Sequence, residues 1–256
     1  MAASLHLAAA GFRVVCIEPE SGVRQPVGES LDWASPKLLA NLGLPLEYLF
    51  EAGIATYKRG VTLRMSDDDK KVLRVAPWLG RAPFHAELFT IHVDRMRLNR
   101  EIRDLVNRRG IVTVSDEAVG VEKDGMRVAA IEAASGRRFA SPWFMDASGS
   151  FKRLLARDFH LPEVAYGPRK VGIWDYFTAA PEHEGTTIYM VPKAGAYQDW
   201  IWEIPIAADT LSVGYIATGD EIKWQREQGL DVAEIFQRQV GRFARSRGKS
   251  RAAYPG

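Results

Sequence analysis

Two tryptophans stand two residues apart in the segment 199–205, which reads Asp-Trp-Ile-Trp-Glu-Ile-Pro. Side chains of a β-strand alternate between its two faces, so Trp200 and Trp202 are expected to form a flat aromatic wall on one face. Pro205 has no N–H to donate to a ladder and predicts the end or an edge of the strand. Residues 211–216 then read as the returning strand of a hairpin. The structural alternative is a pair of core tryptophans beneath a sheet.

Lys58 lies in a second apolar stretch, residues 54–63, which we expect to be a single strand. The acidic run 67–69 predicts a solvated hairpin tip that leads into residues 72–75. A single lysine in a strand usually points to solvent. That interpretation stays open beside a functional one.

Other reactive groups have no pattern that supports chemistry. The sequence has five histidines without metal-ligand spacing, no phosphate-binding glycine-lysine loop and no Gly-x-Ser-x-Gly elbow. Cys16 is the only cysteine, which excludes an intrachain disulfide and a cysteine-based metal site. We therefore expect no metal, and the cysteine content fits a reducing, cytoplasmic compartment.

Composition sets the broad class. The chain has 256 residues, of which 46% are hydrophobic, enough to bury a substantial core. Its formal net charge of +2 gives no argument for nucleic acid or an anionic membrane as a partner, and the basic stretch 242–251 is expected to be solvated or disordered. The apolar residues 1–10 lack a preceding basic region and are too few for a membrane span, so they predict a helix instead.

The first elements are typical of a dinucleotide-binding unit. Residues 2–10 predict a helix that ends at Gly11, and residues 13–17 predict a buried parallel strand closed by Glu18. In such folds this acid bonds a ribose hydroxyl, and a glycine-rich phosphate loop lies about 20 residues before it. No Gly-x-Gly-x-x-Gly occurs in the sequence. We therefore expect the chain to start inside the first helix, through a misassigned start or because it is a fragment.

The Trp-x-Trp-x-Ile-Pro pattern, made by Trp200, Trp202, Ile204 and Pro205, resembles the signature of flavin-dependent halogenases, relatives of the FAD-containing aromatic monooxygenases. The segment Gly28-Glu29-Ser30 is similar to one that these proteins place beside the flavin. The alternative for this segment is a loop in which Ser30 caps a helix over residues 31–42.

Three further segments carry the resemblance. Lys58 follows Glu29 at a spacing close to that of the lysine with which halogenases position or carry the activated halogen. Arg95 belongs to a His-x-Asp-Arg segment whose arginine approaches the flavin in the family, although a surface charge is an equal alternative. Asp146 and Gly149 bound a turn like the one with which the family closes a strand, here expected at residues 143–145, near the cofactor.

The resemblance implies an α/β fold, with a Rossmann-like FAD-binding domain and an antiparallel substrate-domain sheet. We expect FAD-binding parts at 1–55 and 91–165, a β-hairpin insertion at 56–90, antiparallel strands at 166–220, and a helix with an incomplete C-terminal return at 221–256. The helix is expected over residues 221–243, after a hairpin or loop at Gly219-Asp220. Neither the second flavin-binding Gly-Asp segment nor the glutamate-bearing, halide-contacting segment of the family is found.

The implied activity is that of an oxidoreductase of secondary metabolism. FAD would be the cofactor, halide and an electron-rich aromatic or polyketide-like molecule the substrates, and a separate flavin reductase the partner. Lys58 would be catalytic, Trp200, Trp202, Ile204 and Pro205 would line the path to it, and Glu18, Gly28, Glu29, Ser30, Arg95, Asp146 and Gly149 would bind the flavin. Two alternatives remain: a flavin monooxygenase that hydroxylates such a substrate, and a non-catalytic fragment that binds no flavin.

Overall fold

The computed structural model describes residues 1–19, 26–64, 72–75, 78–81, 84–87, 89–164, 167–181, 184–193, 196–243 and 250–251. The chain forms two compact units, each built from two stretches of sequence. Unit 1 comprises residues 1–24 and 99–167, and unit 2 comprises residues 25–98 and 168–256. The five segments expected from the sequence divide the chain differently and stay a prediction.

Unit 1 contains the predicted helix–strand–acid arrangement, but its strand is not buried as expected: Val15 is exposed and Cys16 and Ile17 are only partly buried, because β1 pairs with β8 alone among the described strands. Its elements are α1 (Ala2–Ala9), β1 (Val15–Glu18), most of α4 (Arg95–Arg108), β8 (Val112–Ser115), β9 (Ala118–Asp124), β10 (Arg127–Ala133), β11 (Arg138–Ala140), α5 (Gly149–Lys152) and α6 (Leu154–Asp158). Strand β1 pairs in parallel with β8, and Glu18 faces Ser115 at the end of this ladder. Gly11 follows α1 with φ 90°, a conformation that glycine adopts without strain.

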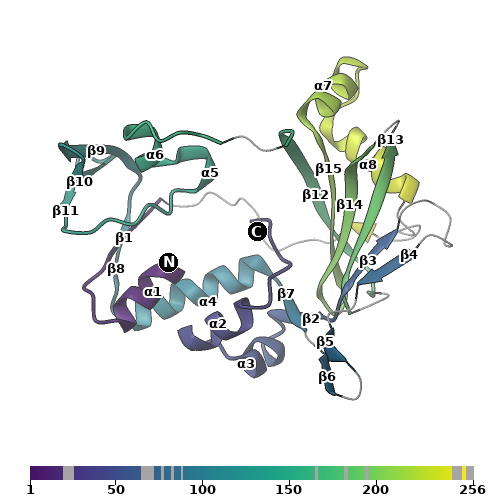
Figure 1. Cartoon of the computed structure of the whole chain (residues 1–256), viewed down its shortest axis with the longest axis horizontal. Coiled ribbons are helices and arrows are strands. Elements are labelled where there is room, and N and C mark those ends of the chain that lie inside the picture. The colour runs from purple at the N-terminus through teal and green to yellow at the C-terminus, as the bar shows by residue number, and fades with distance from the viewer. Residues whose placement is uncertain are drawn as a thin grey trace. The chain divides into compact units, whose positions relative to one another are not determined.

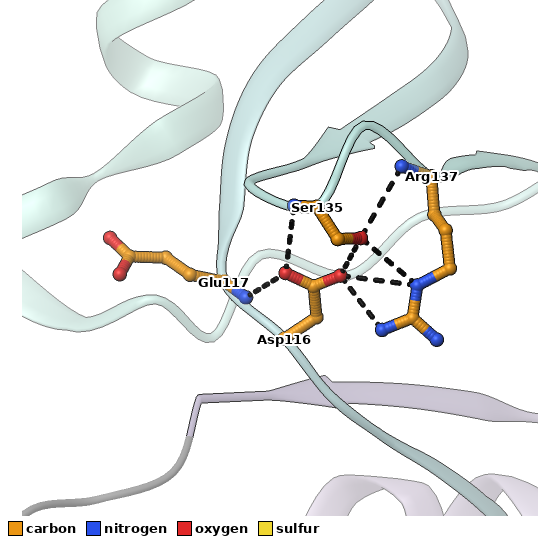
Figure 2. Close-up of polar contacts among 4 residues, drawn as sticks. All are labelled: Asp116, Glu117, Ser135 and Arg137. Atoms are coloured by element: carbon orange, nitrogen blue, oxygen red, sulfur yellow. Dashed lines mark hydrogen bonds and ion pairs between the residues drawn. The ribbon is translucent and has the colours of Figure 1, made fainter.

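A polar cluster holds the second sheet of unit 1, β11-β10-β9, to the end of β8. Figure 2 shows the Asp116 carboxylate between the backbone N–H of Glu117 and the side chains of Ser135 and Arg137. Arg137 donates through Nη2 at 2.8 Å, and Ser135 donates through its hydroxyl and its backbone N–H. The Ser135 hydrogen bond is the main reason why the pKa of Asp116 is below its usual value. Lys152 of α5 also pairs with Glu117. Residues 116–117 therefore connect the end of β8 with α5 and with the turn between β10 and β11.

Unit 2 is built on a seven-stranded sheet with the order β16-β12-β15-β14-β13-β3-β4 (Figure 1). Its strands are β3 (Val61–Arg64), β4 (Val72–Val75), β12 (Lys170–Thr178), β13 (Thr186–Lys193), β14 (Ala196–Ala207), β15 (Thr210–Thr218) and β16 (Ser250–Arg251). The other elements are α2 (Ser35–Leu42), α3 (Leu46–Glu51), β2 (Ala55–Lys58), β5 (Trp78–Arg81), β6 (Phe84–Glu87), β7 (Thr90–Val93), α7 (Gly219–Glu227) and α8 (Val232–Phe243). The predicted antiparallel pairing is confirmed for β12–β15, β15–β14 and β14–β13, whereas β13 and β3 run parallel.

The two faces of this sheet differ. Helices α7 and α8 cover one face, which we call the helix-covered face. Its core consists of Phe177, Tyr189, Val191, Ile201, Leu211, Val213, Tyr215, Ala217, Ile222, Ile235, Phe236 and Val240. The opposite face, which we call the tryptophan face, has a smaller buried cluster of Tyr176, Trp202, Ile204 and Ile206. The two-stranded β2–β7 ribbon packs against β14.

Strand boundaries differ from expectation at three places. Residues 54–63 form two strands because Arg59 and Gly60 separate β2, which pairs with β7, from β3, which pairs with β13 and β4. Strand β14 continues two residues past Pro205, which faces Leu211 beside a register shift. Residues 143–145 form no strand, since no described strand pairs with them.

Helix boundaries also differ. Ser30 does not cap the helix: α2 begins at Ser35, and the carboxylate of Asp32 accepts hydrogen bonds from the backbone N–H groups of Ala34 and Ser35. The helix expected over 221–243 is broken at Gly229, whose φ is 88°, into α7 and α8. Gly219-Asp220 is the first turn of α7 instead of a hairpin or loop, because the Thr218 hydroxyl caps that helix.

Three expectations lie partly or wholly outside the described residues. The hairpin of 61–64 with 72–75 is confirmed by the β3–β4 pairing, but its acidic tip at 67–69 is not described. The start of the loop before Gly28 and most of the basic stretch 242–251 lie outside them as well.

Candidate functional site

Lys58 is the last residue of β2 and is about half-buried. Its Nζ donates to the carbonyl oxygen of Leu31 at 3.4 Å. Because Thr90 faces Lys58 across the β2–β7 ribbon and bonds the carbonyls of Leu31 and Asp32, the loop that follows Ser30 closes over the lysine. Lys58 is therefore partly buried, with its ammonium group bonded to this loop, and its catalytic role stays a prediction.

The surroundings of this lysine make its proton easier to remove than that of an exposed lysine. Burial lowers the pKa of Lys58 below its usual value, because removing an ammonium ion from water disfavours its charged form. The nearby carboxylate of Asp32 opposes this effect in part. Asp32 is exposed and is already occupied by the α2 cap.

His92 lies on the same ribbon, two residues from Thr90 and opposite Thr56. Its side chain is completely buried, and Nε2 lies 2.9 Å from the hydroxyl of Thr186. Burial, together with the charge of Lys58, lowers the pKa of His92 to about 3. The imidazole is therefore neutral at ordinary pH, and it adds no second positive charge to the site.

The tryptophan motif is packed against this ribbon. Thr56 donates to the carbonyl oxygen of Pro205 at 2.5 Å, which joins the strand of Lys58 to the end of the motif. Trp202 and Ile204 are buried on the tryptophan face. Trp200 is less buried, and Lys170 Nζ lies 5.2 Å from its ring centroid. The motif thus contributes buried apolar side chains to the tryptophan face, and its Pro205 carbonyl holds the strand of Lys58.

Gly28, Glu29 and Ser30 form a turn with buried contacts. Gly28 has φ 105°, and a Cβ there would lie 3.0 Å from Nη1 of Arg95. That guanidinium donates to the carbonyls of Val27 and Gly28, at 3.2 and 3.1 Å. Arg95 thus holds the turn in place, and Ser30 pairs with His92 in an isolated bridge. Contact of these residues with flavin stays a prediction.

The remaining predicted flavin residues lie in unit 1. Glu18 ends β1 and has Arg103 Nη2 at 3.4 Å from its carboxylate. Asp146 accepts hydrogen bonds from the backbone N–H groups of Ser148 and Leu155. Burial raises the pKa of Asp146, but the hydrogen bonds from Ser148 and Leu155 outweigh it and hold the pKa below its usual value. Gly149 has φ 81°, so the predicted tight turn is present.

Sequence reasoning assigned no role to His92, Thr56, Tyr176, Thr186 or Ser212. For His92 one local signal was present: it stands between the apolar residues Ile91 and Val93, which favours a buried position. The others face the site only because of strand register.

Within the described part of the chain, no group of three potential metal-binding side chains is present. None of the described helices has the length and apolar character that a membrane crossing requires.

Comparison with known proteins identifies the family. The sequence model for the tryptophan halogenase family matches residues 64–233, more than half of the chain. This match begins after Lys58 and includes the tryptophan motif. A search of curated proteins found no match.

Solved structures show the same fold. A triple mutant of the flavin-dependent brominase Bmp2 matches with a TM-score of 0.79 and 22% identity, over 99% of this chain and 63% of that one. The myxobacterial chondrochloren halogenase CndH matches with a TM-score of 0.76 and 22% identity, over 99% and 58%. A flavoprotein/dehydrogenase from Cytophaga hutchinsonii matches with a TM-score of 0.70 and 19% identity, over 100% and 62%.

This chain therefore spans about 60% of the length of these proteins. The expected α/β fold of FAD-dependent halogenases is confirmed. On the family match, the chain belongs to the tryptophan halogenase family.

Proposed function

We propose that the chain is part of an FAD-dependent halogenase in which Lys58 is the catalytic residue. The observation that carries the proposal is the half-buried Lys58 ammonium, held by the Leu31 carbonyl on a ribbon that is bonded to the Trp-x-Trp-x-Ile-Pro motif. A lysine that only solubilised the surface would not be placed in this way.

FAD would be the cofactor. The residues present fit part of its site: Glu18 ends a parallel strand with its carboxylate partly exposed, as a ribose-binding acid must be. When bound, reduced FAD would supply an oxidised halogen from oxygen and halide. Gly28, Glu29, Ser30, Arg95, Asp146 and Gly149 remain proposed flavin residues.

Lys58 would act on the oxidised halogen in one of two ways. As an ammonium ion, its Nζ would donate a hydrogen bond and make the halogen more electrophilic. As a free amine, Nζ would attack the halogen of a hypohalous acid: the oxygen–halogen bond breaks as the nitrogen–halogen bond forms, and the departing hydroxide takes a proton from the nitrogen and leaves as water. The lowered pKa of Lys58 favours the amine, whereas the Leu31 carbonyl and Asp32 favour the ammonium ion.

The tryptophan motif would line the route and exclude water. Trp200, Trp202, Ile204 and Pro205 present mostly apolar surface, so a reactive halogen species would meet few competing nucleophiles. We propose an electron-rich aromatic or polyketide-like substrate, a separate flavin reductase as partner, and a cytoplasmic location that supplies reduced nicotinamide for that reductase.

The test uses an enzyme that contains this chain, supplied with a flavin reductase, FAD, oxygen and bromide or chloride. Lys58→Met keeps the length of the side chain but removes the amine, and it should abolish halogenated product while flavin reoxidation continues. Lys37→Met, an exposed lysine of α2, is the matched control and should keep full product yield.

Product identity separates the alternatives. Hydroxylated product formed equally without halide, in wild type and Lys58→Met alike, would overturn the proposal in favour of a monooxygenase. The fold itself does not discriminate, since a flavoprotein/dehydrogenase shares it.

Binding of FAD is tested separately by equilibrium dialysis. Glu18→Ala should weaken it by about 1.5 to 3 kcal/mol, the usual value for a hydrogen bond to a charged group. We expect the 256-residue chain alone to bind FAD weakly, because it has no Gly-x-Gly-x-x-Gly phosphate loop. Tight, stoichiometric binding by this chain would contradict that expectation.

A further inference from the structure

Glu29 is a buried carboxylate with several hydrogen-bond donors around it. Only 1% of its surface is exposed, and its carboxyl group accepts three hydrogen bonds. Oε1 accepts from the hydroxyl of Tyr176 at 2.9 Å and from that of Ser212 at 3.2 Å. Oε2 accepts from the backbone N–H of Gly28 at 3.0 Å. The partners of Glu29 therefore come from two strands of the sheet and from its own turn.

Chemistry fixes the direction of these hydrogen bonds. The indole N–H of Trp202 lies 3.1 Å from the Ser212 oxygen, and an indole nitrogen can only donate. Ser212 therefore accepts from Trp202 and uses its single hydrogen to bond Glu29. The result is a continuous path from Trp202 through Ser212 to Glu29, in which every hydrogen points toward the carboxylate. An acceptor-only carboxylate is the group that such an arrangement fits.

Trp202 also packs against the neighbouring strand β15. A Cβ on Gly214 would lie 2.1 Å from a carbon of the Trp202 ring, so the indole rests directly on the bare backbone of β15. The ring cannot slide toward β15, and its N–H is bonded to Ser212. These two constraints determine one orientation for the ring.

The turn that bears Glu29 also leads to the lysine. The Glu29 carbonyl accepts from the backbone of Val93, and the Leu31 backbone N–H donates to Ile91, so both residues are tied to β7. The carbonyl of Leu31, two residues after Glu29, is the group that accepts from Lys58. Displacement of Glu29 would thus be transmitted to both the tryptophan wall and the lysine.

We propose that Glu29 is a positioning residue: its carboxylate orients Trp202 through Ser212 and, through its own turn, fixes the carbonyl that holds Lys58. This role differs from the flavin contact that the resemblance implies. Only one part of it rests on the proposed function, namely that the oriented Trp202 lines the route to Lys58. The hydrogen-bond path itself can be tested without catalysis.

The test is NMR of the chain labelled with ¹⁵N at its seven tryptophans. Trp202→Phe identifies the indole N–H signal of Trp202. Ser212→Ala should shift that signal upfield because the acceptor is lost, and Ser212→Cys, a weaker hydrogen-bonding group, should give a smaller shift. Glu29→Gln should also shift it, because Glu29 is joined to Trp202 through Ser212. An unmoved signal in Glu29→Gln, with a clear shift in Ser212→Ala, would overturn the proposal.

Glu203→Gln is the matched control. Glu203 also accepts a hydrogen bond from a tyrosine, Tyr189, and it is adjacent to Trp202, but it lies on the helix-covered face. It should leave the Trp202 signal in place. If Glu29→Gln fails to fold, Tyr176→Phe tests the same network, because it removes one donor to Glu29 and should shift the Trp202 signal in a folded protein.

Activity and FAD binding provide a second readout. In the active enzyme, Glu29→Gln should lower kcat for halogenation at least tenfold and leave the Kd for FAD within twofold. A tenfold weaker Kd with an unmoved Trp202 signal would instead establish Glu29 as a flavin contact and overturn the positioning role. Absence of halogenation by the wild type would contradict the proposed function alone, since the NMR result does not depend on it.

Discussion

The two faces of the seven-stranded sheet solve the same problem differently. Each face buries a carboxylate that accepts a hydrogen bond from a tyrosine hydroxyl. On the helix-covered face Tyr215 donates to Asp199 at 3.3 Å, and on the tryptophan face Tyr176 donates to Glu29 at 2.9 Å. In both pairs burial, and then the carboxylate, raises the pKa of the tyrosine well above its usual value.

The difference lies in how the charge is balanced. Asp199 has Lys170 Nζ at 3.7 Å, whereas Glu29 makes no ion pair with any residue that the structure describes. Neutral donors satisfy Glu29, and each of them has a single hydrogen, which is committed to the carboxylate, whereas an ammonium ion has three. A cation near a buried carboxylate offsets part of the cost of burying its charge, while directed hydrogen bonds also orient the side chains that donate them.

The largest expected effect concerns the helix-covered face. Ile235 of α8 is completely buried there, so Ile235→Ala should lower the free energy of unfolding by about 2 to 5 kcal/mol through lost burial and a cavity. Urea denaturation measures the loss. The Trp202 indole signal should not move in the folded protein, and a shift as large as that of Ser212→Ala would mean that the two faces are not independent.

The next effect concerns the tryptophan face. Gly214→Ala would place a Cβ against the Trp202 ring and should cost about 1 to 3 kcal/mol, as overpacking usually does. Gly219→Ala is its control, because nothing lies within 4 Å of a Cβ there. Equal stability of the two variants would show that Trp202 moves freely, and the contrast between the faces would fail.

The two tyrosines give a matched pair. Tyr215→Phe and Tyr176→Phe should each cost about 1.5 to 2 kcal/mol, because each removes a hydrogen bond to a buried carboxylate that keeps other partners. Thermal denaturation should therefore rank them as similar. Only Tyr176→Phe should move the Trp202 signal, and a shift in Tyr215→Phe instead would reverse the assignment of roles.

Near neutral pH the smallest effect is that of His92, and it grows as the pH falls. Its pKa falls from an ordinary value of 6.5 to about 3 in the folded chain, so the unfolded chain binds the proton first as pH falls. The contribution of His92 to stability is complete above pH 6.5 and is lost toward pH 3, at about 1.4 kcal/mol per pH unit. His92→Gln should reduce the slope of the free energy of unfolding against pH by this amount, as measured by urea denaturation at several pH values. An unchanged slope would mean that His92 is not buried in its neutral form.

Local patterns were sufficient for several elements. A glycine marks the end of the first helix, at Gly11, and runs of apolar residues mark the strand that ends at Glu18 and the strands β12 to β15. Such signals involve only residues that are close in sequence, so they can be recognised without the fold. Helix α3 was missed because its six residues are too few to show a helical period. The split of residues 54–63 was missed because β2 and β3 pair with different, distant strands.

The candidate site was less predictable for the same reason. Lys58 was found by resemblance, but its burial depends on Leu31 and Thr90, which reach it from separate parts of the chain. Glu29 was singled out as a flavin residue, while the two side chains that donate to its carboxylate lie 147 and 183 residues away. No local propensity encodes such contacts, because they arise from the register of strands in the folded sheet.

The indole of Trp202 on the bare backbone of Gly214 has a consequence for how the family diverges. The two positions must be inherited together, since any side chain at residue 214 would occupy the space of the ring. Among relatives, loss of the glycine should coincide with a smaller residue in place of the tryptophan, and the glycine should persist wherever the tryptophan does. An alignment in which the two positions vary independently would contradict this coupling.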